Sequence, residues 1–425
     1  MKVNLPLCSL LMAIIAFPWG ARAEKIDASK LAGNLREYPY VETPPPAQTP
    51  PPPGYEPFHM EHYGRHGSRW LIGKEDYSVP VEKLEKAERA RVLTQLGEKT
   101  LNALRRIKEA SRGREGELSD KGALQHQAIG RRMALNYPEI FNDSADIDAK
   151  STIVIRCILS MANALQGIQE VVPGIHPTKD ASEADMWFMN FNDRKAWPVK
   201  DSVDRTLLAE YRKNLIKSSD YLDRLVSDPQ FARDSVAPGL MPRLYWVLGN
   251  TQSHTGQPWL FEEVFSEEDL IENWKAGNAG WFSHGGNSPM TRGRMPFVQR
   301  NLLGRIIEQT DSAIANGSHG ARLRYGHDGI LISIITLMEL GGYGDPVESF
   351  EALENTNWKD YDIIPMGSNL QLVFYRNPSR PDSILVKAMI NEEEVTMPGV
   401  PVSGPYYDWN TLRSYYLDKL SSFSE

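Results

Sequence analysis

The sequence predicts an α/β fold with a largely parallel central sheet and helices on both faces. Two strand-like segments, residues 58–63 and 321–325, each run into a glycine-containing loop. A third apolar run, residues 151–156, is typical of a buried strand and precedes a helical pattern near 160–171. Because strand, loop and helix alternate in this way, the ligand site is expected beyond the carboxyl ends of the strands.

The remaining elements follow from residue spacing. Apolar residues at helical intervals predict helices in four segments, which are residues 81–110, 119–136, 296–315 and 330–340. Ser119 or Asp120 is expected to cap the helix 119–136. Residues 369–376 and 383–390 are expected to form a hairpin, and the charged, amphipathic stretch 203–275 indicates a helical insertion.

The first 23 residues have the pattern of a signal peptide. Lys2 precedes an apolar stretch too short to span a membrane, and Ala21-Arg22-Ala23 fits a signal peptidase site. A periplasmic or secreted location is therefore expected. Residues 24–57 are expected to form a proline-rich N-terminal arm, extended over 43–57, with the folded chain starting after it.

Composition limits the partners. The full chain has a net charge of −8, and removal of Lys2 and Arg22 would leave 45 basic against 55 acidic residues, near −10. Nucleic acid is then an unexpected partner, whereas a small anion could bind where cations are locally concentrated. Cys157 is the one cysteine after the predicted leader, so no internal disulfide is expected.

The segment Arg65-His66-Gly67-Ser68-Arg69 has the chemistry for phosphoryl transfer. Two guanidiniums match phosphate oxygens in bidentate fashion, and glycine allows the backbone to approach a ligand. Fixed cations on both sides disfavour protonation of His66, which leaves a neutral ring nitrogen free to attack phosphorus. A solvated basic turn is the alternative interpretation.

A second group of candidates lies elsewhere in the chain. His327 and Asp328 follow the predicted strand 321–325, and Asp328 is the candidate proton donor for a poor alkoxide leaving group. The alternative for Asp328 is a cap of the helix 330–340, a role compatible with proton donation. Arg156, at the end of the predicted strand 151–156, would be costly to bury unpaired. Its partner is therefore expected to be either a phosphate or an internal acid.

Taken together, these motifs resemble those of the histidine acid phosphatase family. The resemblance includes Arg65 to Arg69, Arg156 with Ser160, and His327-Asp328, and it extends to a helical region around Gly130 and to the C-terminal segment 404–409. It implies that His66 forms a phosphohistidine, that Arg65, Arg69, Arg156 and His327 hold the phosphate, and that Asp328 protonates the leaving oxygen.

The same resemblance implies a phosphoglycerate-mutase-like core with a helical cap. The core is expected to comprise residues 58–189 and 285–425, and the cap residues 190–284. Two features depart from the family. Trp70-Leu71 stands where a proline often follows the motif, and His327-Asp328 replaces the His-Ala-Glu that is frequent in related inositol polyphosphate phosphatases.

The expected function is hydrolysis of phosphomonoesters, with inositol phosphates, sugar phosphates and general phosphomonoesters all compatible. A phosphotransferase or mutase sharing the phosphohistidine, or a non-catalytic phospholigand-binding protein, are the alternatives. No cofactor and no metal are expected: His59, His62 and His66 with Glu61 would need a helix to share one face, and they lie in a strand pattern. The oligomeric state is open.

Overall fold

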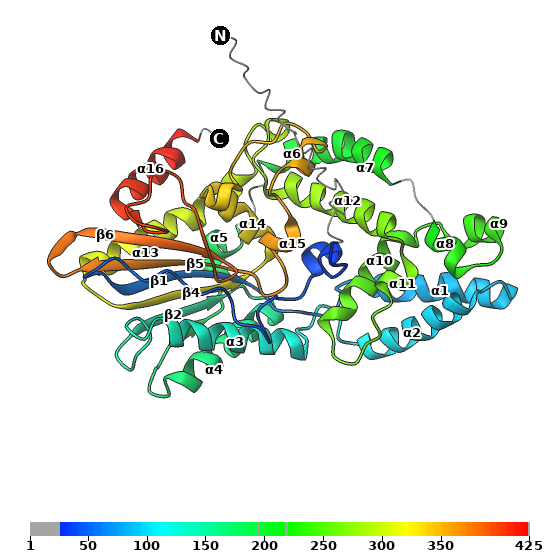
Figure 1. Ribbon diagram of the computed structural model, residues 1–425, viewed down its shortest axis with the longest axis horizontal. Coiled ribbons are helices and arrows are strands. Elements are labelled where there is room, and N and C mark those ends of the chain that lie inside the picture. The colour runs from blue at the N-terminus through cyan, green and yellow to red at the C-terminus, as the bar shows by residue number, and fades with distance from the viewer. Residues whose placement is uncertain (1–25, 192, 194, 217–219, 424–425) are drawn as a thin grey trace, which may run out of the picture.

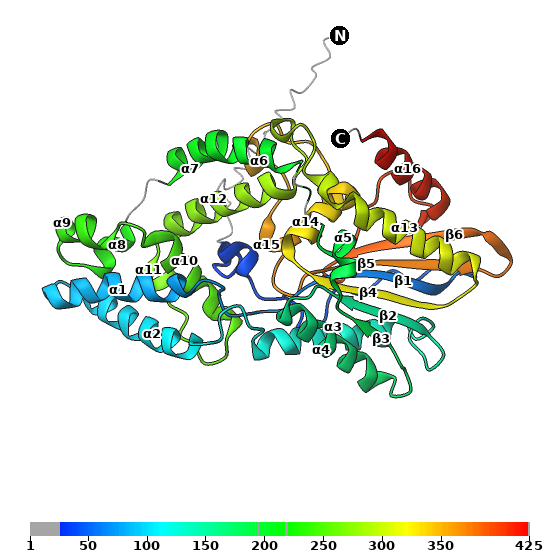
Figure 2. The same cartoon turned by 180° about the vertical axis from the view of Figure 1, so that it is seen from behind.

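The computed structural model describes residues 26–191, 193, 195–216 and 220–423 (Figure 1). The predicted signal peptide, residues 1–23, lies outside these residues. Figures 1 and 2 show a sheet covered by helices on two faces and, beside it, a part built of helices alone. Within the described part of the chain, no helix has the length and apolar character needed to cross a membrane.

One mixed sheet forms the centre of the fold. Its order is β3-β2-β4-β1-β5-β6-β7, with β8 paired to β6; β3, β2, β4 and β1 are parallel and the rest antiparallel. The strands are β1 (Glu56–Arg65), β2 (Asp146–Ser151), β3 (Thr178–Asp180), β4 (Gly320–Gly326), β5 (Asn369–Asn377), β6 (Arg380–Ile390), β7 (Glu393–Val395) and β8 (Tyr407–Asp408). The α/β fold is confirmed, and so is the hairpin, formed by β5 and β6.

Alternating side chains of the strands bury both faces of the sheet. In β5, Leu372 and Phe374 join one buried cluster, whereas Val373 and Tyr375 join the other. The helices α3 (Asp120–Asn136) and α4 (Ile155–Val171) cover the second face, and α13 (Arg300–Ala315), α14 (Asp328–Leu337) and α16 (Trp409–Ser422) cover the first. As predicted, Ser119 caps α3, accepting a hydrogen bond from the Gly122 amide.

The helical part contains more of the chain than the sequence indicates. The predicted helix 81–110 is two helices, α1 (Lys74–Ala90) and α2 (Gln95–Ser111), because Arg91 adopts a left-handed conformation with φ of 61°. Their apolar faces share a buried cluster with residues such as Leu225, Leu244 and Trp274. Residues 74–111, expected in the core, therefore pack with the helical insertion.

The other helices complete this part and its connections to the sheet. They are α5 (Met186–Met189), α6 (Trp197–Val203), α7 (Ala209–Leu215), α8 (Asp220–Leu225), α9 (Pro229–Phe231), α10 (Met241–Gly249), α11 (Phe261–Val264), α12 (Glu267–Gly285) and α15 (Asp360–Ile363).

The strand predicted over residues 151–156 is wrong by five positions. β2 ends at Ser151, and Ile155 already begins α4. The β-branched run was misleading because Ile153 and Ile155 are 46 and 70% exposed. The true strand alternates instead, with Ile147, Ala149 and Ser151 buried.

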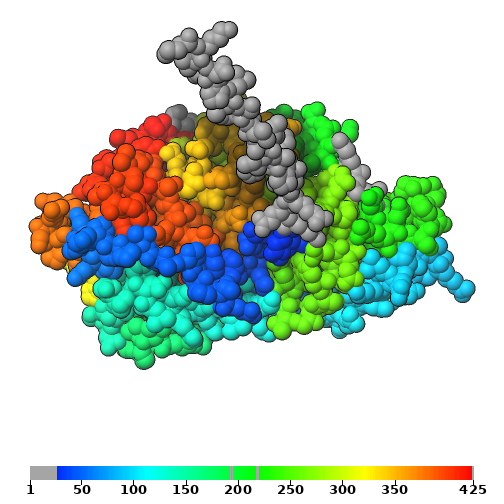
Figure 3. All heavy atoms as spheres, viewed as in Figure 1, coloured from blue at the N-terminus to red at the C-terminus, as the bar shows by residue number. Residues whose placement is uncertain are grey.

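The folded chain starts before the proline-rich stretch, contrary to the prediction that it starts after residue 57. Residues Lys30–Leu35 form η1, which consists of two short 3-10 turns that meet at a kink, because the backbone of Gly33 is not helical. Leu31, Ala32 and Leu35 of this segment are buried in the cluster of the helical part. In Figure 3 the blue N-terminal residues run as a band across the face of the molecule, between its orange and its green parts. This segment brings residues 31–35 close to the ends of the strands.

Candidate active site

Three neighbouring parallel strands deliver most of the candidate residues. β1 ends at Arg65, which is paired with Gly326 at the end of β4, so His66 and His327 leave the sheet side by side. Their rings lie 5.9 Å apart, centroid to centroid. Arg156 follows β2, but it lies in the first turn of α4 and not at a strand end as predicted. The candidates thus gather at the carboxyl edge of the sheet.

His66 is a buried, neutral imidazole. Its Nδ1 lies 2.9 Å from the carbonyl oxygen of Gly67, and since a carbonyl can only accept, Nδ1 carries the hydrogen. Burial, followed by the charges of Arg65, Arg69 and Arg156, holds the pKa of His66 well below its usual value. Its Nε2 therefore keeps a lone pair for nucleophilic attack.

Glycine is required next to this histidine. A Cβ on Gly67 would lie 2.4 Å from the carbonyl oxygen of Gly122, at the start of α3. The Gly67 amide donates to Ser160 Oγ at 3.1 Å, which ties the loop to α4. The loop is thereby fixed between α3 and α4.

The three arginines keep unused donors. Arg65 is fully buried and donates from Nη1 to the carbonyl oxygens of Asn34 and Ile364, each at 2.6 Å. Arg69 donates from Nη1 to the Trp70 carbonyl oxygen at 3.0 Å. The buried Nε atoms of Arg65, Arg69 and Arg156 have no hydrogen-bond partner among the described residues. Buried donors rarely remain unpaired, so this cluster is suited to an anion with several acceptor oxygens.

His327 is held beside His66. Its Nε2 lies 3.3 Å from Thr152 Oγ1, and burial, with Arg156 as the next cause, lowers its pKa to about 4. Cys157 lies behind this ring and is a thiol, because burial raises its pKa to about 11. A neutral His327 can donate one hydrogen bond to a phosphate oxygen.

Asp328 begins α14 and is ionised in the ligand-free protein. Its Oδ2 pairs with Arg65 Nη2 at 2.8 Å and accepts from Asn34 Nδ2 at 3.2 Å, while Oδ1 accepts from the Gly329 amide at 2.9 Å. Burial raises the pKa of this carboxyl, but Arg65, Arg69 and His327 outweigh it, and the pKa lies below its usual value. The side chain is 18% exposed.

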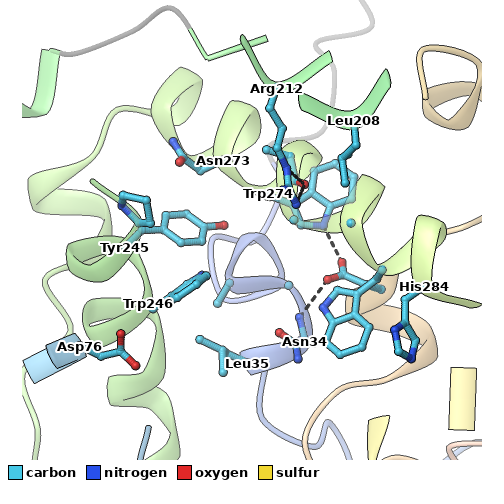
Figure 4. A pocket seen from close by; sticks show the side chains of 18 of the residues that line it. Asn34, Leu35, Asp76, Leu208, Arg212, Tyr245, Trp246, Asn273, Trp274 and His284 are labelled. Atoms are coloured by element: carbon cyan, nitrogen blue, oxygen red, sulfur yellow. Dashed lines mark hydrogen bonds between the residues drawn. The ribbon is translucent and has the colours of Figure 1, made fainter. Parts of the chain in front are cut away.

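A pocket of about 730 Å³ adjoins this cluster (Figure 4). Arg69 and Asn34 line it on the side of the strands. Its opposite walls come from the helical part and carry mostly apolar and aromatic side chains. Two cations, Lys200 and Arg212, also line these walls, and each already interacts with another group of the protein. Lys200 pairs with Asp204, and Arg212 donates to the Ala276 carbonyl oxygen. The other walls include Leu208, Tyr245, Trp246, Trp274, Trp281 and His284.

The alternative metal cluster is not formed. His59 Nε2 lies 2.9 Å from Glu61 Oε1, and Glu61 also pairs with Arg324 at 2.5 Å, so its carboxylate is already compensated. His62 packs against Tyr325 instead, with ring centroids 5.1 Å apart. Among the described residues, no three His, Cys, Asp or Glu side chains are grouped to hold a metal ion.

Sequence reasoning missed Asn34 and Thr152. Thr152 follows β2 directly and could have been considered once that strand was placed correctly. Asn34 lies 294 positions before its partner Asp328. The apolar residues around it, Leu31, Ala32 and Leu35, were the only local sign that this segment packs against the fold.

Solved structures similar to this chain share its fold. A multiple inositol polyphosphate phosphatase of Bifidobacterium longum has a TM-score of 0.75 at 18% identity, over 91% of this chain and 97% of that one. A phytase of D. castellii has a TM-score of 0.70 at 15% identity, over 96 and 89%. A phytase of Hafnia alvei has a TM-score of 0.53 at 12% identity, over 87 and 98%. No curated protein sequence matches the chain.

At these identities the similarity establishes the fold alone. The family is established by sequence: the model of the histidine phosphatase superfamily, branch 2, matches residues 65–391, more than three quarters of the chain. This span begins at the Arg65-His66 motif and includes His327-Asp328. The chain therefore belongs to branch 2 of the histidine phosphatase superfamily.

Proposed function

We propose that this phosphatase hydrolyses small phosphomonoesters through a covalent phosphohistidine on His66. The observation that carries the proposal is the state of His66: a buried, neutral ring with a free Nε2, beside three guanidiniums whose Nε donors are unused. A phosphoryl group placed there would accept from Arg65, Arg69, Arg156 and His327 and present phosphorus to the imidazole.

The reaction has two steps. In the first, the bond from Nε2 to phosphorus forms as the bond from phosphorus to the leaving oxygen breaks, and Asp328 gives that oxygen its proton. In the second, a water oxygen attacks phosphorus, the nitrogen to phosphorus bond breaks, and the proton lost by water returns to Asp328. The products are an alcohol and inorganic phosphate.

The charge of the substrate supplies the protonation that Asp328 lacks in the ligand-free protein. The arginines hold its pKa low, and a bound phosphate would offset their charge and so raise it. A substrate that arrives as the monoanion also brings a proton. Both effects predict an acidic pH optimum.

The pocket walls indicate where the alcohol portion of the substrate binds. We propose that residues 190–284 act as a cap, together with α1 and α2, because Lys200, Arg212 and Trp246 line the pocket opposite Arg69. Inositol phosphates and sugar phosphates are the proposed substrates. Inositol phosphates are suggested by the similarity to the inositol polyphosphate phosphatase and the phytases.

We further propose export to the periplasm or the exterior, based on the leader-like residues 1–23.

The test of function is product profiling with purified protein on phytate, glucose 1-phosphate and p-nitrophenyl phosphate. Release of phosphate that is lost in His66→Ala supports the proposal. Binding of phosphate esters without turnover would contradict it and favour a phospholigand-binding protein.

A further inference from the structure

The segment before the proline-rich stretch enters the active site through Asn34. Its side-chain Nδ2 donates to Asp328 Oδ2 at 3.2 Å, and its carbonyl oxygen accepts from Arg65 Nη1 at 2.6 Å. Arg65 Nη2 contacts the same Asp328 oxygen at 2.8 Å. Asn34 thus contacts both members of the Arg65 and Asp328 ion pair, from outside the span matched by the family model.

The position of Asn34 is fixed by a buried carboxylate. The Asn34 amide donates to Asp360 Oδ2 at 3.1 Å (Figure 4). Asp360 is itself held by Trp274 Nε1 at 2.9 Å and by the contact of its amide with Asn278 Oδ1. The preceding Gly33 has φ of 61°, and a Cβ on it would lie 2.8 Å from Asp360 Oδ2. Only glycine fits between Asn34 and this anchor.

Packing holds the whole segment in place. Leu31, Ala32 and Leu35 are each at most 6% exposed and contribute to the buried cluster of the helical part. Tyr245 donates through its hydroxyl group to the Leu31 carbonyl oxygen. Asn34 therefore belongs to a buried, hydrogen-bonded segment that contacts both the helical part and the sheet edge.

Resting on the proposed function, we infer that Asn34 is a positioning residue for the proton donor Asp328. Asn34 Nδ2 donates a hydrogen bond to Oδ2, and the cationic Arg65 Nη2 lies 2.8 Å from the same oxygen as its ion-pair partner, while Oδ1 has the Gly329 amide alone. Oδ2 thus carries the negative charge, and Oδ1 is the oxygen better able to take and give the proton. The charged and titratable groups that interact with this carboxyl are the cations Arg65 and Arg69, the imidazoles of His327 and His284, and the uncharged Tyr63 and Cys157.

Replacing Asn34 with leucine removes the donor at nearly the same volume. Loss of a hydrogen bond to a carboxylate costs roughly tenfold in kcat with an alkyl phosphate, and KM should change little. p-Nitrophenyl phosphate, whose leaving group needs no proton, should lose at most about twofold. The lost hydrogen bond stabilised the ionised form of Asp328, so its loss should raise the pKa of this carboxyl. In the pH profile of the rate with an alkyl phosphate, the decline on the basic side should therefore move to higher pH.

Two variants and a control keep this test sharp. Gly33→Ala leaves the Asn34 side chain intact but displaces it, and it should show the same difference between the two substrates. Asn34→Asp puts a second carboxyl beside Asp328 and should move the basic limb further still. Asn410→Leu, at an exposed asparagine that donates to the Asp382 carbonyl oxygen, is the matched control and should change neither substrate.

The outcomes separate the inference from the proposed function. Equal losses with both substrates and an unmoved pH profile would assign Asn34 a purely structural role and overturn the inference, as would no loss at all. In either case, phosphate release by the wild type that is abolished in His66→Ala would leave the proposed function standing. Absence of turnover in the wild type would instead overturn the proposed function.

Discussion

Arg65 and Asp328 form an ion pair, Nη2 to Oδ2 at 2.8 Å, between the end of β1 and the start of α14. The pair couples the phosphate-binding group to the proposed proton donor. Since Arg65 is fully buried, its charge needs a counterion, and Asp328 supplies it until a phosphate arrives. Phosphate binding and protonation of Asp328 are then linked events.

Asp328→Asn should damage the hydrolysis of alkyl phosphates far more than that of p-nitrophenyl phosphate. General-acid assistance contributes about 10² to 10⁴ for a basic alkoxide and little for a nitrophenolate. Steady-state kinetics on both substrates across pH measures the difference. The wild-type rate with the alkyl substrate should fall as pH rises, because the acid must be protonated. The helix-cap interpretation is already wrong, because His327 is the N-cap of α14 and Asp328 its first residue. An equal loss on both substrates with the same pH profile would leave Asp328 only the role of orienting Arg65.

Arg156→Gln should lower kcat by roughly 10² while leaving the fold intact. Its Nε has no partner among the described residues, so its removal breaks few contacts, whereas a preorganised donor to a developing charge is worth about 10² to 10³. Kinetics with p-nitrophenyl phosphate measures the expected loss of kcat, and thermal unfolding checks that the fold is intact. Arg131→Gln, at an arginine of α3 paired with Glu170, is the control. A normal kcat in Arg156→Gln would mean that this arginine does not bind the transferred phosphoryl group.

Activity should survive exhaustive chelation. The negative charge of the substrate is met by guanidiniums of Arg65, Arg69 and Arg156, so a metal ion has no role to fill. The measurement is turnover after dialysis against EDTA, with and without added divalent ions. Loss of activity that a divalent ion restores would contradict the mechanism.

Asp360→Asn should remove a pH dependence of stability. Burial raises the pKa of Asp360 from 3.8 to about 6, so between about 4 and 6 the folded state binds more proton than the unfolded state. Stability of the wild type should therefore fall as pH rises through this window, by roughly 3 kcal/mol at most. Urea unfolding at several pH values measures it, with exposed Asp382→Asn as the control. A parallel profile in wild type and Asp360→Asn would show that this carboxyl does not titrate there.

The central motifs could be predicted because their chemistry is local. Arg65 to Arg69 and His327-Asp328 each follow a strand directly, and strands of one parallel sheet end at a common edge. Their adjacency across about 260 residues followed from that rule. The position of Arg156 could not be derived, because a β-branched run that is exposed on a loop resembles a buried strand in sequence.

Asn34 shows the opposite limit. Its segment is a pair of 3-10 turns kinked at Gly33, too short to show a helical period in the sequence, and Asn34 contacts Asp328 across 294 positions. The proline-rich residues 43–57 follow this segment in the sequence, and they favoured the prediction that residues 24–57 form an extended arm outside the fold. Likewise, the division between sheet and helical parts was misjudged because α1 and α2 bury their apolar faces against residues more than 100 positions later.

The most direct test of the account is to trap the phosphoenzyme. Rapid quench of wild type with a labelled aryl phosphate, followed by peptide mapping under alkaline conditions, should place one phosphoryl group on His66. His66→Ala should show no label and lose at least about a thousandfold in turnover, whereas His176→Ala, at an exposed histidine, should behave as wild type. A label on any other residue, or turnover in His66→Ala above about a thousandth of wild type, would contradict a phosphohistidine mechanism.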